Sequence, residues 1–97
     1  MSPVLEHVVL TIDPSTAEVY EAAFAEARPL IESQPGCGGA RLIRIIEAPG
    51  RYVLMVEWAT MEDHMQGFRN SPEFPRWREL LHHFYVTPPN VEHGTNV

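Results

Sequence analysis

The first apolar segment, residues 4–12, constrains the fold of this 97-residue chain more than any other feature. Its sequence VLEHVVLTI is rich in β-branched residues, which predicts a β-strand. Alternate side chains of a strand point to opposite faces of the sheet. One face would carry Val4, Glu6, Val8, Leu10 and Ile12, and the other would carry Leu5, His7, Val9 and Thr11. Because both faces are largely apolar, this strand has to be covered on both sides.

A long helix is predicted after the turn at residues 13–14. Ser15 and Glu18 have the spacing of a capping box, in which each side chain binds a backbone N–H of the first turn. Pro29 lies inside the helical pattern, so we expect a kink or an early end near Ala27. The face turned to the core is predicted to hold Val19, Tyr20, Ala23, Phe24, Ala27 and Ile31.

Three more strands are predicted from short apolar runs, at residues 40–47, 51–58 and 90–93. The first two are separated by a short turn of Ala, Pro and Gly, which is typical of a hairpin. The last one follows two prolines. Because proline cannot donate a backbone hydrogen bond, this strand is expected at an edge or an end of the sheet.

Two shorter helices are predicted within residues 57–84, which also hold most of the candidate chemistry. Thr60 is a good N-cap, and Asp63 can return the capping interaction. Ser71 is the predicted cap of the second helix, with Pro72 at its first position, where a missing N–H costs nothing. Met61, His64, Met65 and Phe68 would share one face of the first helix, and the inner face of the second would hold Phe74, Trp77, Leu81 and Phe84.

The order of these elements is βαββαβ, with the second helical region broken in two. Right-handed crossovers turn that order into a ferredoxin-like α+β fold, a four-stranded antiparallel sheet with helices on one face. At this length we expect one domain, residues 1–97. The second face of the sheet still needs a cover, and another copy of the same sheet would supply it. The sequence therefore predicts a homodimer.

Composition and motifs argue against several classes of function. The net charge is −6, and all seven basic residues are scattered arginines, which argues against nucleic-acid binding. The absence of lysine excludes Schiff-base catalysis and a P-loop. Cys37 is the only cysteine, and His82 and His83 are adjacent rather than four apart, so we expect no metal and no cofactor. Without a long apolar run or a signal sequence, we expect a cytoplasmic protein with no membrane partner.

Much of the chain resembles one known family. The segments VLTI, EAAFAEARPLI, PGCGG, YVLMVEW, EDHMQGFRNSPEFPRW and PPNVEH are similar to those of the antibiotic biosynthesis monooxygenase family. The resemblance implies a dimeric α+β barrel, in which each subunit keeps a pocket between its sheet and its helices. Characterised members include cofactor-free monooxygenases of aromatic polyketides, quinol oxygenases and haem-degrading enzymes.

The residues typical of the haem-degrading branch do not match this chain. In that branch an Asn on the first strand, a Trp on the helix after the third strand and a haem-ligating His recur. These positions fall near His7 or Val8, at Phe68 and near Arg78. Haem degradation is therefore not expected. Many other members carry a His at the position of Phe68, and the nearest His on the same helical face is His64, one turn earlier.

The candidate catalytic residues are His64 and Trp77. A neutral imidazole with a pKa near the working pH suits removal of a phenolic proton, although His64 could instead pack in the core and bind a backbone carbonyl. Trp77 is equally compatible with a substrate site and with the core. The candidate substrate-binding residues, which could form an aromatic slot for a flat ligand, are Phe68, Tyr20, Phe24 and His7. For Phe24, a place in the ordinary core is the better interpretation.

Charged residues in the strands leave further alternatives open. Glu6 and Glu57 lie in otherwise apolar strands, where a carboxylate is either at the rim or buried with a partner and a shifted pKa. For a buried carboxylate, His7 is a plausible partner, and it could also act as an independent base. We favour a rim or dimer-interface pair. Arg44 is expected to pair with such a carboxylate across the dimer, and Trp58 is interpreted as structural.

The resemblance, taken with these residues, implies a cofactor-independent monooxygenase for a small hydrophobic aromatic, quinol or polyketide-like substrate, with molecular oxygen as its co-substrate. The base would remove a proton, and the resulting anion would reduce oxygen directly. Two alternatives keep the same fold. One is a non-catalytic dimeric module that binds a small ligand, and the other is a redox-neutral isomerase or cyclase that uses the same histidine.

Overall fold

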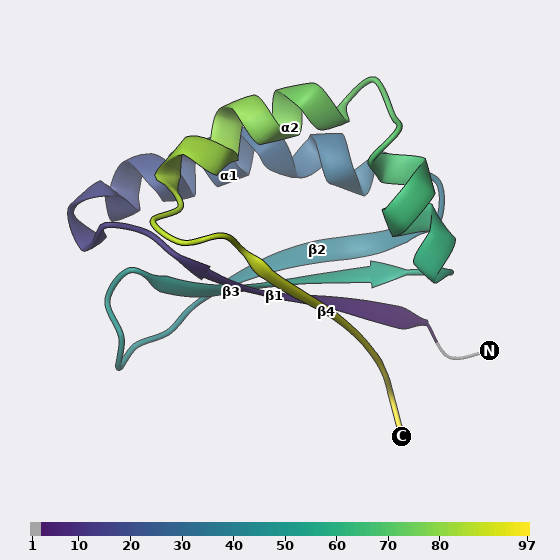
Figure 1. Ribbon diagram of the computed structural model, residues 1–97, viewed down its shortest axis with the longest axis horizontal. Coiled ribbons are helices and arrows are strands. Elements are labelled where there is room, and N and C mark those ends of the chain that lie inside the picture. The colour runs from purple at the N-terminus through teal and green to yellow at the C-terminus, as the bar shows by residue number, and fades with distance from the viewer. Residues whose placement is uncertain (1–2) are drawn as a thin grey trace.

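The computed structural model of the chain describes residues 3–97 and has two layers, a four-stranded antiparallel sheet and helices packed on one of its faces (Figure 1). The strands are β1 (Val4–Thr11), β2 (Cys37–Arg44), β3 (Arg51–Trp58) and β4 (Asn90–Thr95), in the order β2-β3-β1-β4. This arrangement confirms the predicted ferredoxin-like α+β fold. It also places β4 at an edge, as its preceding prolines predicted.

The main difference among the strands concerns β2, which was predicted at residues 40–47. It begins at Cys37 and ends at Arg44, because the glycines before Ala40 join the sheet through an irregular register rather than forming a loop. Gly39 has a φ of 134°, a conformation that side chains rarely adopt, so glycine suits this irregularity. A glycine-rich segment can therefore extend a strand as well as end one.

The first helical region consists of η1 (Pro14–Thr16) and α1 (Ala17–Glu32). The predicted capping box is wrong, because the Asp13 carboxylate accepts the backbone N–H of Ser15 at 2.9 Å and starts η1 instead. The expected early end near Ala27 is also wrong, since α1 continues through Pro29 to Glu32, while the alternative of a kink stays a prediction. Pro29 and Ala25 are both exposed, so water can satisfy the carbonyl that Pro29 leaves without a partner.

The second region consists of η2 (Asp63–Phe68), α2 (Phe74–Leu81) and η3 (His82–Phe84). The predicted cap is confirmed, since the backbone N–H of Asp63 binds Thr60 Oγ1 at 3.2 Å and Asp63 Oδ2 accepts the N–H of Thr60 at 3.1 Å. Unexpectedly, η2 is wound as a π-helix. The prediction that Ser71 caps α2 is wrong, because its hydroxyl donates to the Phe68 carbonyl at 2.7 Å and closes η2.

The core lies between the sheet and the helices. The inner face of α1 contributes Tyr20, Phe24, Ala27 and Ile31 as predicted, but Val19 is 64% exposed and does not belong to it. The sheet contributes the buried side chains Val8, Leu10, Ile12, Ala40, Tyr52, Leu54, Val56 and Trp58. Since these residues alternate along β1 and β3, one face of each strand supplies the core.

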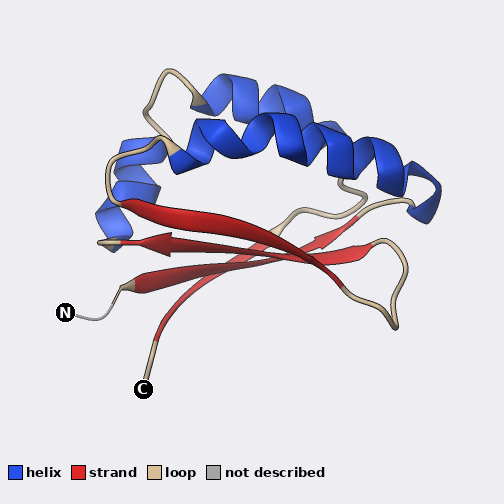
Figure 2. Ribbon diagram, turned by 180° about the vertical axis from the view of Figure 1, so that it is seen from behind, coloured by secondary structure: helices blue, strands red, loops and turns tan. Residues whose placement is uncertain are grey.

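Among residues 3–97, no helix packs on the opposite face of the sheet, which we call the open face (Figure 2). Its central apolar side chains are half-buried or exposed within one chain, and they are Leu5, Val9, Ile43, Val53 and Met55. Pairing of this face with a second copy stays a prediction. Within residues 3–97 no helix has the length and apolar character needed to cross a membrane, since α1 has only 16 residues.

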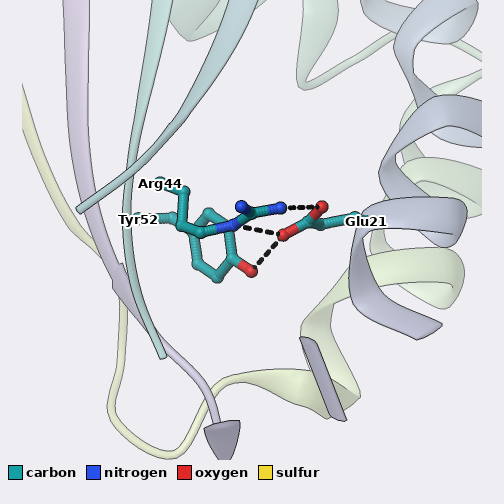
Figure 3. Close-up of polar contacts among 3 residues, drawn as sticks. All are labelled: Glu21, Arg44 and Tyr52. Atoms are coloured by element: carbon teal, nitrogen blue, oxygen red, sulfur yellow. Dashed lines mark hydrogen bonds and ion pairs between the residues drawn. The ribbon is translucent and has the colours of Figure 1, made fainter. Parts of the chain in front are cut away.

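A polar cluster fastens α1 to the sheet (Figure 3). Glu21 accepts two hydrogen bonds from Arg44, at 2.8 Å from Nε and 2.6 Å from Nη2, and a third from the Tyr52 hydroxyl at 2.6 Å. These bonds lower the pKa of Glu21, the bonds from Arg44 most. The expectation that Arg44 pairs across the dimer is therefore wrong, because its carboxylate partner lies on α1 of the same chain.

Candidate functional site

A cavity of about 490 Å³ lies between the inner face of the sheet and the helices η2 and α2. Val8, Leu10 and Leu54 form its apolar floor, while Phe68 and Trp77 contribute aromatic rings from the helices. The other lining residues are Glu6, Ile31, His64, Arg69, Phe74, Arg78, His82, Tyr85, Pro89 and Val91. Arg69, Arg78 and His82 are exposed, so the cavity combines apolar walls with a basic rim.

Three of the predicted site residues meet at this cavity. His64 and Phe68 are one turn apart on η2 and are both buried, and Trp77 reaches the same cavity from α2. The Phe68 and Trp77 rings pack edge to face with centroids 5.5 Å apart. Short segments wound as π-helices are frequent at functional sites. The roles of these three residues stay predictions.

The other predicted binding residues lie elsewhere. Phe24 is in the core behind the cavity, where its ring packs against Trp77 at a centroid distance of 6.2 Å. Tyr20 lies on the inner face of α1, where it is fully buried, and it does not line the cavity. His7 lies on the open face, with its side chain 42% exposed and Nδ1 3.9 Å from a carboxylate oxygen of Glu92. His7 therefore cannot contact a ligand in the cavity of its own chain.

Glu6 is the polar residue that most changes the interpretation of the site. Its side chain is buried, with the residue only 4% exposed, and Oε1 accepts the indole N–H of Trp58 at 2.9 Å. The same oxygen lies 3.4 Å from Nε2 of His64. The favoured rim position of Glu6 is thus wrong, and its partner is His64 rather than His7. Glu57 is exposed, as a rim position requires.

His93 completes the cluster. Its Nε2 lies 2.8 Å from Nδ1 of His64, and the register of the sheet places His93 directly opposite Glu6. His93 is not among the predicted site residues, because no local pattern marks a functional histidine on a short edge strand. The topology could have indicated it, because an edge strand paired with β1 has to bring some of its side chains beside Glu6.

Aromatic packing fixes the orientation of the imidazole of His64. The His64 ring stacks on Trp58, with centroids 5.5 Å apart and planes inclined by 19°. Trp58 was interpreted as structural, but the structure also makes it a hydrogen-bond donor to Glu6. One indole therefore orients both the carboxylate and the imidazole of the cluster.

Burial sets the protonation of this pair. It raises the pKa of the Glu6 carboxyl, against the opposing effects of the Trp58 hydrogen bond and the Arg69 charge. It also lowers the pKa of His64 to about 4, with His93 and Arg69 adding to the effect. His64 is therefore neutral at pH 7, which differs from the predicted value near the working pH. A neutral imidazole can accept a proton, but its buried cation is unstable.

A second polar group lies in the part of the cavity near the C-terminal end of β1. Tyr85 lines the cavity, and its hydroxyl is 3.0 Å from the hydroxyl of Tyr20. Burial raises the pKa of Tyr85 to about 12, although the hydrogen bond from Tyr20 works against the rise. The Tyr85 phenol is therefore protonated at neutral pH and can donate a hydrogen bond. Tyr20, predicted to bind substrate, acts here as the support of Tyr85.

No metal-binding group of three or more His, Cys, Asp or Glu side chains is found in the described part of the chain, residues 3–97. The cluster of Glu6, His64 and His93 contains suitable atom types, but these atoms do not converge on one point. The two ring nitrogens of His64 face different partners, Nε2 towards Glu6 and Nδ1 towards His93.

Comparison with known proteins gives two independent matches. The sequence pattern of the antibiotic biosynthesis monooxygenase family matches residues 3–80. The uncharacterized protein YczJ of Bacillus subtilis (strain 168) is 40% identical over 94 residues, which cover 97% of this chain and 99% of that protein.

Solved structures agree with these matches. A crystal structure from Bordetella bronchiseptica, provisionally named an antibiotic biosynthesis monooxygenase, is 39% identical with a TM-score of 0.95, covering 100% of this chain and 99% of its own. A mutant of SnoaB, a cofactor-independent oxygenase from Streptomyces nogalater, is 22% identical with a TM-score of 0.76, covering 100% of this chain and 93% of its own. At that identity SnoaB supports the fold alone.

Proposed function

Because the chain belongs to the antibiotic biosynthesis monooxygenase family, we propose that it is a cofactor-independent monooxygenase of a small aromatic, quinol or polyketide-like substrate. Its site is the cavity between the sheet and the helices, with His64 as part of the base and Phe68 and Trp77 against the substrate rings. Molecular oxygen is the co-substrate. Activity of this kind is named for one structural neighbour, SnoaB.

One observation carries this proposal, a cavity of about 490 Å³ whose apolar walls surround a buried carboxylate–imidazole pair. The volume is in the range of ordinary small-molecule sites. Aromatic side chains and the apolar floor favour a flat hydrophobic ligand, and the pair beside them can accept a proton. Exclusion of water by the walls strengthens every electrostatic interaction inside.

The chemistry needs only the substrate, oxygen and a base. Removal of a proton from a phenol, or from a CH₂ group conjugated to one, leaves an electron-rich anion that can transfer electrons to O₂. When the CH₂ group becomes a carbonyl, one oxygen atom enters the product and the other leaves as water. The substrate supplies all the electrons and both hydrogens, so the reaction needs no external reductant. The chain contributes orientation, desolvation and the base.

A redox-neutral isomerase or cyclase is the second candidate, and Tyr85 favours it. Its protonated phenol and the neutral His64 face the same cavity, so a proton could be removed at one position and a developing oxyanion stabilised at another. Such a reaction would leave the mass of the substrate unchanged and would consume no oxygen.

Oxygen uptake on a panel of quinols and anthrones tests the proposal. We expect uptake that depends on the protein, with one atom of label from ¹⁸O₂ in the product. A product of unchanged mass without oxygen uptake would support the isomerase or cyclase. Saturable binding of the panel without any conversion would leave a ligand-binding module and contradict both enzymes. The control is Met61→Ala, since Met61 precedes η2 but is exposed and does not line the cavity.

The functional unit that we propose is a homodimer formed through the open face. The support is physical, since Leu5, Val9, Val53 and Met55 form an apolar surface that the helices of the same chain do not cover. A two-fold pair of sheets would bury that surface on both copies at once. An interface of about 2,000 Å² or more is expected for an obligate pair.

A further inference from the structure

The cavity lining carries positive charge in an otherwise acidic protein. Two arginines, Arg69 and Arg78, stand against a single carboxylate, Glu6. With the histidines neutral, the lining has a net charge of +1 when Glu6 is ionised, and of +2 when Glu6 takes up a proton, which its raised pKa makes easier. The whole chain has a net charge of −6. A cleft lined by one sign of charge concentrates ligands of the opposite sign, so this cavity should favour anions.

Neither arginine of the lining has a carboxylate partner in the described part of the chain. Arg28, Arg44 and Arg76, which lie outside the lining, each form an ion pair with a glutamate. A guanidinium is a planar fork of donors that matches the two oxygens of a carboxylate. The donors of Arg69 and Arg78 are therefore available to an acidic ligand.

Each of these arginines directly follows an aromatic residue of the cavity wall. Arg69 comes after Phe68 at the end of η2, and Arg78 comes after Trp77 on α2. The two aromatic side chains are buried with their rings edge to face, whereas the two arginines are exposed. A ligand whose ring lies against the aromatics can therefore reach the arginines with a substituent that points to the mouth of the cavity.

The positive charges already act on neighbouring groups. Burial lowers the pKa of His64 to about 4, and the charges of His93 and Arg69 add to the effect. Burial also lowers the pKa of His82, and the charge of Arg78 adds to it. Positive charge at this end of the cavity is thus not balanced by the chain itself. A bound anion would offset it and would be stabilised by it.

We propose that the cavity takes an aromatic acid, whose ring lies against Phe68 and Trp77 and whose carboxylate is bound at the mouth by the two arginines. The proposal rests on the proposed function only in taking this cavity as the ligand site. A volume of about 490 Å³ suits an acid with a small fused ring system. Because the arginines are exposed, the carboxylate keeps contact with water as well as with its partners.

An acid group at Arg69 would also change the buried pair of Glu6 and His64. The charge of Arg69 works against protonation of both residues. A carboxylate bound beside Arg69 adds a negative charge that opposes this effect, so both residues should bind a proton more readily. A neutral ligand of the same shape lacks that charge. Recognition of the acid would thus make the pair a stronger base when the ring is in place.

Binding of two matched ligands tests the proposal without turnover. The probes are a hydroxynaphthoic acid, with its hydroxyl and carboxyl groups on different rings, and the corresponding carboxamide, which differs mainly in charge. We expect wild type to bind the acid about tenfold more tightly than the amide at low ionic strength. The preference should shrink as salt is added. Equal affinities, or no binding of the acid, would overturn the proposal.

Variants of the two arginines locate the acid group. Arg69→Gln and Arg78→Gln should each weaken binding of the acid, and the double variant should bind acid and amide within about threefold of each other. Affinity for the amide should be unchanged, because exposed substitutions rarely disturb the fold. The matched control is Arg51→Gln, since Arg51 is also exposed, without a carboxylate partner in the described chain, and outside the lining. A preference for the acid that survives in the double variant would overturn the proposal.

A carboxyl carbon-13 titration tests the link to the buried pair. In wild type, binding of the acid should raise the pKa of Glu6 more than binding of the amide does. Both ligands displace water from the cavity, so the difference between them reports the added charge. In Arg69→Gln the difference should shrink. The same pKa of Glu6 with both bound ligands would contradict a position of the acid group beside Arg69.

The proposed function and the acid-binding proposal fail in different ways. An acid preference that depends on the two arginines, without conversion of any member of the substrate panel, would contradict the monooxygenase and leave a binding site for aromatic acids. Conversely, oxygen uptake on neutral quinols together with equal binding of acid and amide would refute the acid-binding proposal and leave the monooxygenase standing.

Discussion

Glu6 and His7 are neighbours on one strand, yet they belong to different parts of the molecule. Glu6 turns to the inner face of the sheet, where it is 4% exposed and contacts Trp58 and His64. His7 turns to the open face, where its side chain is 42% exposed beside Glu92. The two faces of β1 therefore lie in different surroundings. The inner face holds a buried polar cluster beside a cavity, and the open face is expected to serve assembly.

The largest effect is expected on the inner face. If His64 takes part in proton removal, His64→Ala should lower the rate by about 10²–10⁴-fold. The loss of stability should be only about 1–3 kcal/mol, the range for removing a partner of a buried polar group. Turnover and thermal melts are measured on the same preparation, with Met61→Ala as the control. A destabilised variant whose folded fraction works at the normal rate would end the catalytic interpretation of His64.

The next effect concerns the open face. Met55→Glu should place a carboxylate in the proposed interface, once on each copy because of the two-fold symmetry. Desolvating such charges costs several kcal/mol, so dimer affinity should fall by more than about 100-fold. Sedimentation equilibrium at micromolar concentration measures this, with Val19→Glu on the exposed side of α1 as the control. Wild-type protein that is already monomeric under these conditions would contradict the proposed dimerisation through the open face.

A third effect links the inner face to pH. The pKa of His64 is lowered from 6.5 to about 4, so between these values the unfolded chain binds more protons than the folded one. The free energy of unfolding should therefore keep its full value above pH 6.5. Through this group it should decrease by about 3 kcal/mol as the pH falls towards 4. Glu6 acts oppositely, because its raised pKa favours the folded state at low pH.

His64→Gln should remove the contribution of the histidine, so the variant should lose less stability than wild type between pH 6.5 and 4. Chemical denaturation across that range measures the difference. The values at pH 8, where His64 is neutral in both states, give the reference for each protein. Parallel curves for variant and wild type would show that His64 is not held neutral by burial.

The smallest effect concerns the support of Glu6. Trp58→Phe keeps the ring against His64 but removes the N–H that Glu6 accepts at 2.9 Å. Loss of one bond to a buried acceptor should cost about 1–3 kcal/mol. Because the carboxylate loses a donor that favours its charged form, the pKa of Glu6 should also rise. A thermal melt and a carboxyl carbon-13 titration test both points, and an unchanged titration would mean that the indole does not tune Glu6.

The sequence was sufficient for the layers of this fold and for part of the cavity lining. Alternation along β1 and β3 and the order of elements predicted the sheet, its edge strand and the helical side. The shared face of His64 and Phe68 predicted one wall of the cavity. These features depend on local periodicity, which the sequence carries directly.

The errors have a different physical origin. Proline tends to end a helix, but Pro29 is exposed and α1 continues through it. Serine tends to cap the start of a helix, but the Ser71 hydroxyl binds the Phe68 carbonyl of the preceding turn instead. The pairing of Glu6 with His64 and His93 depends on the register of β1 with β4 and on the π-helical winding of η2. Neither is encoded by spacing along the chain. The alternation of β1 did place Glu6 on the same face as core residues. That pattern favoured a buried position with a polar partner over a position at the rim of the sheet.

The most direct measurement of the central claim is the ionisation of a bound phenol under anaerobic conditions. The claim is that the buried cluster accepts a proton from an aromatic ligand in the cavity. We expect ultraviolet difference spectra at pH 7 to show phenolate when a quinol or anthrone binds to wild type, and neutral phenol when it binds to His64→Ala. A ligand that fails to bind, or that binds to wild type and stays neutral, would contradict the account.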